Sequence, residues 1–149
     1  MNHSQLMNIT AGLPMKTIII NDEPYLERYF DTECADGTQV WIHRFLRNDS
    51  ERHLHSHPWN AQSKVLLGSY TESLGMTTAT YTAGDTNTIP SHKLHRIIEV
   101  QPNTWTIMTV APERLAQWYF IDEMGNRENM KASPVDWYKD CAPRAEGNV

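Results

Sequence analysis

Short runs of β-type residues, separated by turn signals, fill most of the chain between residues 16 and 121. The turn signals recur about every eight to twelve residues and helical periodicity is almost absent, which is typical of a β-sandwich or barrel. Residues 25–30 fit a helical turn or a strand equally well. Strands are expected at residues 17–20, 39–47, 53–57, 63–67, 70–74, 77–81, 86–89, 96–100, 104–110 and 117–121. We therefore expect an all-β fold, closed as a small barrel or jelly roll because closure removes exposed strand edges.

The length of the chain bounds its domain organisation. With 149 residues, it is long enough for one domain with its own core and too short for two domains of typical size. Residues 1–14 are polar and weakly patterned, which predicts a flexible N-terminal tail, and residues 142–149 are expected to form a flexible C-terminal tail. The barrel domain is expected over residues 15–141, with Trp137 and Tyr138 packed on its outside.

Composition argues against several classes of partner. The formal net charge is −5 and no basic run exists, so phosphate-backbone binding and a nucleic-acid partner are not expected. Cys34 and Cys141 lie far apart without metal-type spacing, which favours two free thiols in a reducing compartment. No signal-peptide pattern is visible, and the longest apolar cluster is far shorter than the roughly 20 residues of a membrane helix. We expect a cytoplasmic protein without a membrane partner.

The histidines gather in two groups that can form one site. His53, His55 and His57 alternate along one predicted strand, and His92 and His95 follow a later turn. Residues two apart on a strand share a face, so the first group can project together and His95 can meet it from a neighbouring strand. Because neutral imidazole is the commonest protein metal ligand, this pattern predicts a shared metal site.

The two histidine groups resemble the paired motifs of the cupin superfamily. His55, His57 and Gly68 match the first motif, G-x5-H-x-H-x3,4-E-x6-G, and the second motif, G-x5-P-x-G-x2-H-x3-N, is matched in register by Gly84, Pro90 and His95. The resemblance covers about residues 40–110 and implies a single-domain cupin-type jelly-roll barrel. It also implies a possible homodimer, since cupins commonly pair through strand edges. The pattern of neighbouring residues further resembles that of small uncharacterised cupins of bacteria and phages. The residues in this pattern are Trp59, Ser63, Leu66, Tyr70 and Glu72.

The departures from the motifs concern the ligand set. The glutamate ligand of the family would fall at Ala61 or at Gln62, and neither is a carboxylate. The resemblance therefore transfers three ligands, His55, His57 and His95. Three neutral ligands leave the charge of a dication uncancelled and keep coordination positions open. Fe(II) is favoured, because cupins that resemble thiol dioxygenases hold it with three histidines, whereas Zn, Mn or Ni are alternatives.

Five further residues are expected to form or border a substrate pocket. Trp59 ends the histidine strand, and an aromatic side chain at that position can wall a pocket as well as pack in the core. Arg44 and Arg96 are candidates for binding an anionic group of the substrate. His53 and His92 are expected at the rim of the site.

The leading hypothesis is a metal-dependent enzyme of cupin type acting on a small molecule, most plausibly with an Fe(II) oxygenase-like activity, and no catalytic residue is assigned. One alternative is a non-catalytic small-ligand-binding module, which the missing carboxylate at Ala61 favours. Another is a metal-independent isomerase or epimerase of sugar type that uses a histidine base and Tyr70 or Tyr81 as acid. His43 is expected to be a hydrogen-bonded, partly buried histidine, and Glu72 could replace the missing carboxylate if the barrel register shifts.

Overall fold

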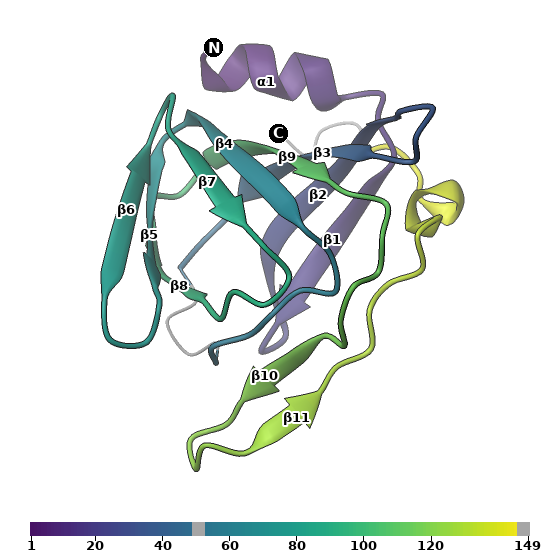
Figure 1. Ribbon diagram of the computed structural model, residues 1–149. Helices are drawn as coiled ribbons and strands as arrows, with labels where there is room; N and C mark the ends of the chain where they lie inside the picture. Colours follow the sequence, from purple (N-terminus) through teal and green to yellow (C-terminus); the bar gives the residue numbers. More distant parts are fainter. Residues whose placement is uncertain (49–52, 146–149) are drawn as a thin grey trace.

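The computed structural model describes residues 1–48 and 53–145. The protein consists mainly of antiparallel strands (Figure 1). The elements in chain order are α1 (His3–Thr10), β1 (Met15–Ile20), β2 (Glu23–Glu33), β3 (Gln39–Phe45), β4 (Ala61–Leu67), β5 (Ser69–Ser73), β6 (Thr78–Thr82), β7 (Thr86–Ile89), β8 (Arg96–Val100), β9 (Thr104–Val110), β10 (Tyr119–Ile121), β11 (Arg127–Asn129) and a 3-10 helix at Trp137–Asp140. No helix among these described residues has the length and apolar character needed to cross a membrane.

Two sheets enclose the core of the domain, and two further strands form a separate hairpin. The larger sheet has six strands in the order β1-β2-β3-β9-β4-β7, and the smaller has three in the order β6-β5-β8. Because β4, β7 and β9 belong to the larger sheet and β5, β6 and β8 to the smaller, the chain crosses repeatedly between the sheets, as jelly rolls do. Strands β10 and β11 form a hairpin that extends from the body of the domain (Figure 1) and is joined to it by a bridge between Phe120 of β10 and His55. The all-β, jelly-roll expectation is confirmed.

The interior has two apolar ends. At one end Tyr25, Phe45 and Val65 of the larger sheet pack against Tyr70 and Val100 of the smaller sheet, which shows that the sheets face each other. Trp41, Trp59, Ala61, Ile89, Val110 and Trp137 form the cluster at the other end. Trp137, expected on the outside of the barrel, is buried in this second cluster. Polar side chains that include His43, Glu72 and Asn87 are buried as well, and they belong to neither apolar cluster.

The N-terminal segment is not a loose tail, because it contains helix α1. Asn2 and Gln5 form a capping box, with each side chain accepting a hydrogen bond from the other residue's backbone N–H at 2.9 Å. Leu6 and Met7 are buried on the outer face of the larger sheet, against residues that include Trp105. Burial of this apolar face stabilises a helix that is too short to form by itself.

The C-terminal segment is also tied down over its described part. Arg144 donates hydrogen bonds to the Tyr29 hydroxyl at 2.7 Å and to the Met7 carbonyl at 3.0 Å, and it thereby joins the segment to α1. The expected flexible tail from residue 142 is therefore wrong as far as residue 145, and residues 146–149 lie outside the described part. Cys34 and Cys141 are both free, as expected.

Candidate metal centre

Backbone pairing brings the two histidine groups together. The N–H of His55 donates to the His95 carbonyl at 3.0 Å, and the N–H of His95 donates back at 3.1 Å. This reciprocal pair is an antiparallel bridge, and His55 also bridges Phe120 on its other side. The strand predicted over residues 53–57 is therefore reduced to the single bridged residue His55. The bridge places His95 beside His55, while His57 follows one pleat later on the same face.

Three imidazole rings converge at this bridge. One ring nitrogen from each of His55, His57 and His95 lies within 4.8 Å of the others, and Nε2 of His57 is 3.0 Å from Nε2 of His95. His55 and His95 are buried and His57 is half-buried. Two imidazole nitrogens this close repel each other unless a proton or a cation lies between their lone pairs. The arrangement therefore suits a shared ion.

The outer nitrogens of two rings are engaged by the protein. Nδ1 of His55 lies 3.0 Å from the His53 carbonyl oxygen, and Nδ1 of His95 lies 3.1 Å from Oε1 of Glu72. An acceptor at Nδ1 holds the proton there and leaves Nε2 with the lone pair that a metal requires. The protein therefore selects the ligand tautomer of both rings.

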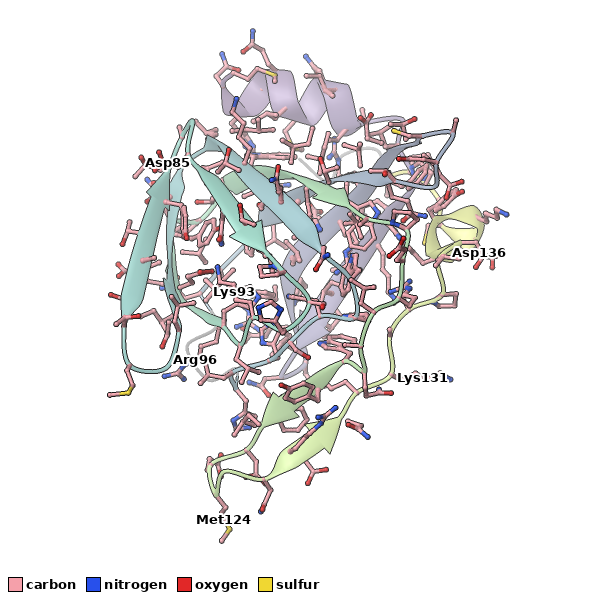
Figure 2. The ribbon with its side chains drawn as sticks, viewed as in Figure 1. Asp85, Lys93, Arg96, Met124, Lys131 and Asp136 are labelled. Carbon is pink, nitrogen blue, oxygen red and sulfur yellow. The ribbon has the colours of Figure 1, made fainter. Side chains whose placement is uncertain are left out.

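Glu72 stands behind His95 in a buried polar network. Its carboxylate is fully buried, accepts a hydrogen bond from Asn87 at 2.8 Å and pairs with Lys93 Nζ at 2.8 Å. Burial alone would raise the pKa of Glu72, but hydrogen bonds from His95, Lys93 and Asn87 outweigh it and lower the pKa to about 2. Glu72 is thus an ionised partner of a ligand, and the structure places it outside the ring cluster. Figure 2 labels Lys93 in the loop between β7 and β8.

The donor set fits a first-row divalent metal. A nitrogen pair 3.0 Å apart can bind one ion at about 2.1 Å from each atom with an angle near 90°. The overall 4.8 Å spread exceeds the roughly 4.2 Å that two opposite bonds span and the roughly 3.4 Å of two tetrahedral bonds, so one ring would have to close by about 0.6 to 1.4 Å. Ala61 is buried on β4 and brings no carboxylate. A set of imidazoles suits Fe, Zn, Ni or Cu.

Trp59 lies beside this cluster, as its position in the sequence suggested. Its ring meets the ring of His57 edge to face, with centroids 4.7 Å apart. Trp59 also contacts Trp41 and borders a cavity of about 230 Å³, together with Val110 and Arg114. The side chain therefore separates His57 from a partly apolar cavity at the second end of the barrel.

The two arginines proposed to bind an anion differ in their surroundings. Arg44 forms an ion pair with Glu27 at 3.1 Å and a hydrogen bond to Asn103, with its guanidinium over Trp105 on the outer face of the larger sheet. Because alternate residues of a strand face opposite sides, Arg44 points away from the barrel interior that holds His43. This placement removes Arg44 from the residues facing the cluster. Arg96 begins β8 directly after His95 and is half-buried (Figure 2).

The two remaining histidines lie outside the ring cluster. The ring of His53 stacks on Phe120 with centroids 5.2 Å apart, and only its backbone carbonyl reaches a ligand. His92 is exposed in the loop between β7 and β8. Sequence reasoning missed Lys93 and Asn87, because nothing in their spacing shows that the loop after β7 meets Glu72 of β5.

Comparisons with known proteins identify the fold. No protein family model matches the chain, and no curated protein matches it either. Among solved structures, a cupin-2 domain, Rru_A2000 from Rhodospirillum rubrum, aligns with a TM-score of 0.61 and 14% identity over 76% of this chain and 78% of that one. KdgF from Halomonas sp. aligns with a TM-score of 0.52 and 19% identity over 66% of this chain and 96% of that one. Fe(II) HppE aligns with a TM-score of 0.56 and 14% identity over 66% of this chain and 56% of that one.

The chain therefore has the cupin fold, a jelly-roll barrel, and carries a cluster of three histidines able to hold a metal ion.

Proposed function

We propose that this chain is a metal-dependent enzyme acting on a small molecule, with His55, His57 and His95 holding a divalent ion. The observation that supports this most is the convergence of three rings whose nitrogens lie within 4.8 Å, two of them with Nδ1 already engaged. An ion with three protein ligands keeps open positions at which it can polarise a substrate or activate a small oxidant. The reaction class we favour is an Fe(II) oxygenase-like one.

Two considerations support iron and an oxygenase-like activity. Imidazole is a suitable ligand for Fe(II), and one of the similar folds is that of Fe(II) HppE. With alanine at position 61, no carboxylate among the described residues joins the three rings, so the ligands themselves leave the charge of a bound dication uncancelled. A site with that charge attracts anionic or acceptor-rich ligands.

The residues of the chain itself would bind and orient the ion. The His53 carbonyl and the Glu72 carboxylate keep the protons of His55 and His95 on Nδ1, which fixes the direction of each lone pair. Trp59 packs against His57 and restricts rotation of its ring. Burial of His55 and His95 limits the access of water to the cluster.

A non-catalytic binding module is the second candidate. The observation that favours it is Ala61, since loss of the usual acidic ligand also fits a site that only binds. The metal-free isomerase has less support, because burial raises the pKa of both Tyr70 and Tyr81, and the Tyr70 hydroxyl also accepts a hydrogen bond from Asn87 at 3.0 Å. A tyrosine held in this way is a poor general acid near neutral pH.

Metal content of untagged protein tests the proposal. We expect near-stoichiometric metal in the wild type and its loss in His55→Ala and His95→Ala, whereas His92→Ala, which changes an exposed histidine of the same loop, should retain it. Chelated protein reloaded without air with Fe(II), Zn(II) or Mn(II) would then be assayed for oxygen consumption with candidate substrates. Folded wild type that takes up none of the three ions would refute the metalloenzyme. Metal binding without substrate turnover would leave the binding module.

A further inference from the structure

His43 is a buried histidine with one ring nitrogen, Nε2, that has no hydrogen-bond partner in the described part of the chain. It lies on the inward face of β3 between Trp41 and Phe45, with ring centroids 6.1 and 6.4 Å away, and is 5% exposed. Its Nε2 is buried and has no hydrogen-bond partner among the residues that the structure describes. The expectation of a hydrogen-bonded histidine therefore does not hold at Nε2. Because buried polar atoms are nearly always paired, we expect a water or a ligand to be the partner of this nitrogen.

A guanidinium faces the same interior. Arg28 of β2 pairs in register with His43, and cross-strand partners project to the same face of a sheet. Its guanidinium carbon lies 4.6 Å from the ring centroid of Trp41 and 5.7 Å from that of Trp137. Burial, followed by the charge of Arg28, holds the pKa of His43 well below its usual value. The imidazole is therefore neutral and can donate one hydrogen bond while Arg28 supplies positive charge.

Two indole N–H groups near these side chains also lack acceptors. Trp59 and Trp137 are each 8% exposed, and the Nε1 of each is buried without a hydrogen-bond partner in the described part of the chain. Both rings contact Trp41, at centroid distances of 5.8 and 5.6 Å. Trp59 in turn contacts His57 of the metal cluster. Unpaired donors and a cation thus gather around Trp41, one side chain away from a metal ligand.

We infer that Arg28, His43 and Trp59 form a subsite for the oxyanion group of the substrate, so that the substrate is a small organic anion. This inference rests on the proposed function, which it deepens by naming a substrate class. A carboxylate or a phosphate offers acceptors only and pairs well with guanidinium, imidazole and indole N–H groups. Of the three residues only Trp59 borders the cavity of about 230 Å³, which Trp41 also lines, and a cavity below the usual range for drug-sized ligands favours a small molecule.

Binding of small probe anions tests the subsite. We would titrate chelator-treated and metal-loaded protein with benzoate, phenyl phosphate and neutral benzamide, following tryptophan fluorescence and thermal unfolding. The variants are Arg28→Gln, Arg28→Lys and His43→Leu, with circular dichroism as the check on folding. Arg44→Gln is the matched control, because Arg44 lies on the adjacent strand but faces outward.

We expect the wild type to bind at least one of the anions more tightly than benzamide, with the preferred anion separating a carboxylate from a phosphate site. Arg28→Gln should weaken that binding on the order of 10- to 100-fold, as loss of a charge-assisted hydrogen bond does. Arg28→Lys should recover part of it, His43→Leu should weaken it less, and Arg44→Gln should leave it unchanged.

Equal affinity of the wild type for both anions and benzamide would overturn the inference and leave an ordered water as the partner of His43. Anion binding that survives Arg28→Gln and is lost in Arg114→Gln would overturn it too, by moving the site to the cavity wall. The two proposals fail separately. Protein that holds no metal but binds benzoate through Arg28 would refute the metalloenzyme alone, and protein that holds metal without preferring anions would refute the subsite alone.

Discussion

Replacing Glu72 with glutamine removes a buried negative charge behind His95 and keeps the size of the side chain and one acceptor oxygen. In the native structure the carboxylate is fully buried and contacts His95, Asn87 and Lys93, whose side chain is 17% exposed. Removing one member of a buried ion pair costs about 3–5 kcal/mol, because the other charge stays desolvated. Since Lys93 retains some contact with water and glutamine retains an acceptor, we expect Glu72→Gln to cost about 3 kcal/mol.

The same reasoning predicts a favourable coupling energy between Glu72 and Lys93 in a double-mutant cycle. Lys93→Met alone leaves the Glu72 carboxylate buried without its cation, so its cost should be similar. The double variant removes both charges and should cost clearly less than the sum, with a coupling of about 2 kcal/mol. Glu72→Gln should also lower metal affinity on the order of 10- to 100-fold, because the charge that orients and polarises the imidazole of His95 is lost.

Urea unfolding of chelated protein measures the stabilities, and competition with a chromogenic chelator measures the metal affinities. Glu99→Gln is the control, because Glu99 is an exposed carboxylate on the neighbouring strand β8. Additive costs in the cycle would show that the Glu72–Lys93 pair carries no net coupling. Unchanged metal affinity in Glu72→Gln would show that this carboxylate does not tune His95, and our account of the site would then be wrong.

Three further experiments test the fold. Gly68 has φ +85°, and a Cβ there would lie 2.4 Å from the Thr104 side-chain oxygen, so Gly68→Ala should cost about 2–4 kcal/mol in urea unfolding. Gly84→Ala, at φ +97° but in open space, should cost only about 1 kcal/mol. Since the folded pKa of His43 is depressed, the unfolded chain binds its proton more readily, and stability should fall as pH drops below about 6.5. His43→Leu should flatten this slope in a pH series of unfolding curves, whereas an unchanged slope would contradict a neutral, buried imidazole. Leu6→Ala should cost about 2–5 kcal/mol by opening a cavity under α1, and a cost near zero would show that the helix is not docked in solution.

Much of the fold could be predicted because strand alternation and turn residues are local signals. The predicted runs 86–89, 96–100 and 104–110 coincide with β7, β8 and β9. Helix α1 was missed because it has only eight residues and its stability comes from contact with distant residues such as Trp105. Strand β11 was missed because Arg127–Asn129 is polar and exposed, so no apolar face marks it.

The metal ligands could be predicted because they share a sequence motif. The residues around them could not, because the sheet register decides which side chains face the interior. The spacing of His55 and His57 already implies a common face, and the structure brings His95 to it. Arg44 was chosen as an anion-binding residue but faces outward, whereas Arg28, which was not chosen, faces the interior. That choice could not be made from the sequence, because residues 25–30 were ambiguous between helix and strand and had no assignable inward face.

The topology also determines when the histidine cluster can exist during folding. β3 pairs with β9, so that Val40 meets Thr109, and the His55–His95 bridge forms between two further distant segments. Such pairings carry a large loop-closure entropy and make folding slow, and no short fragment of the chain can assemble the three rings. An ion bound there would consequently stabilise the whole domain by mass action, so thermal unfolding would depend on the concentration of free metal. In a cell, the supply of metal would then influence how long each newly made chain stays folded and how often it meets proteases.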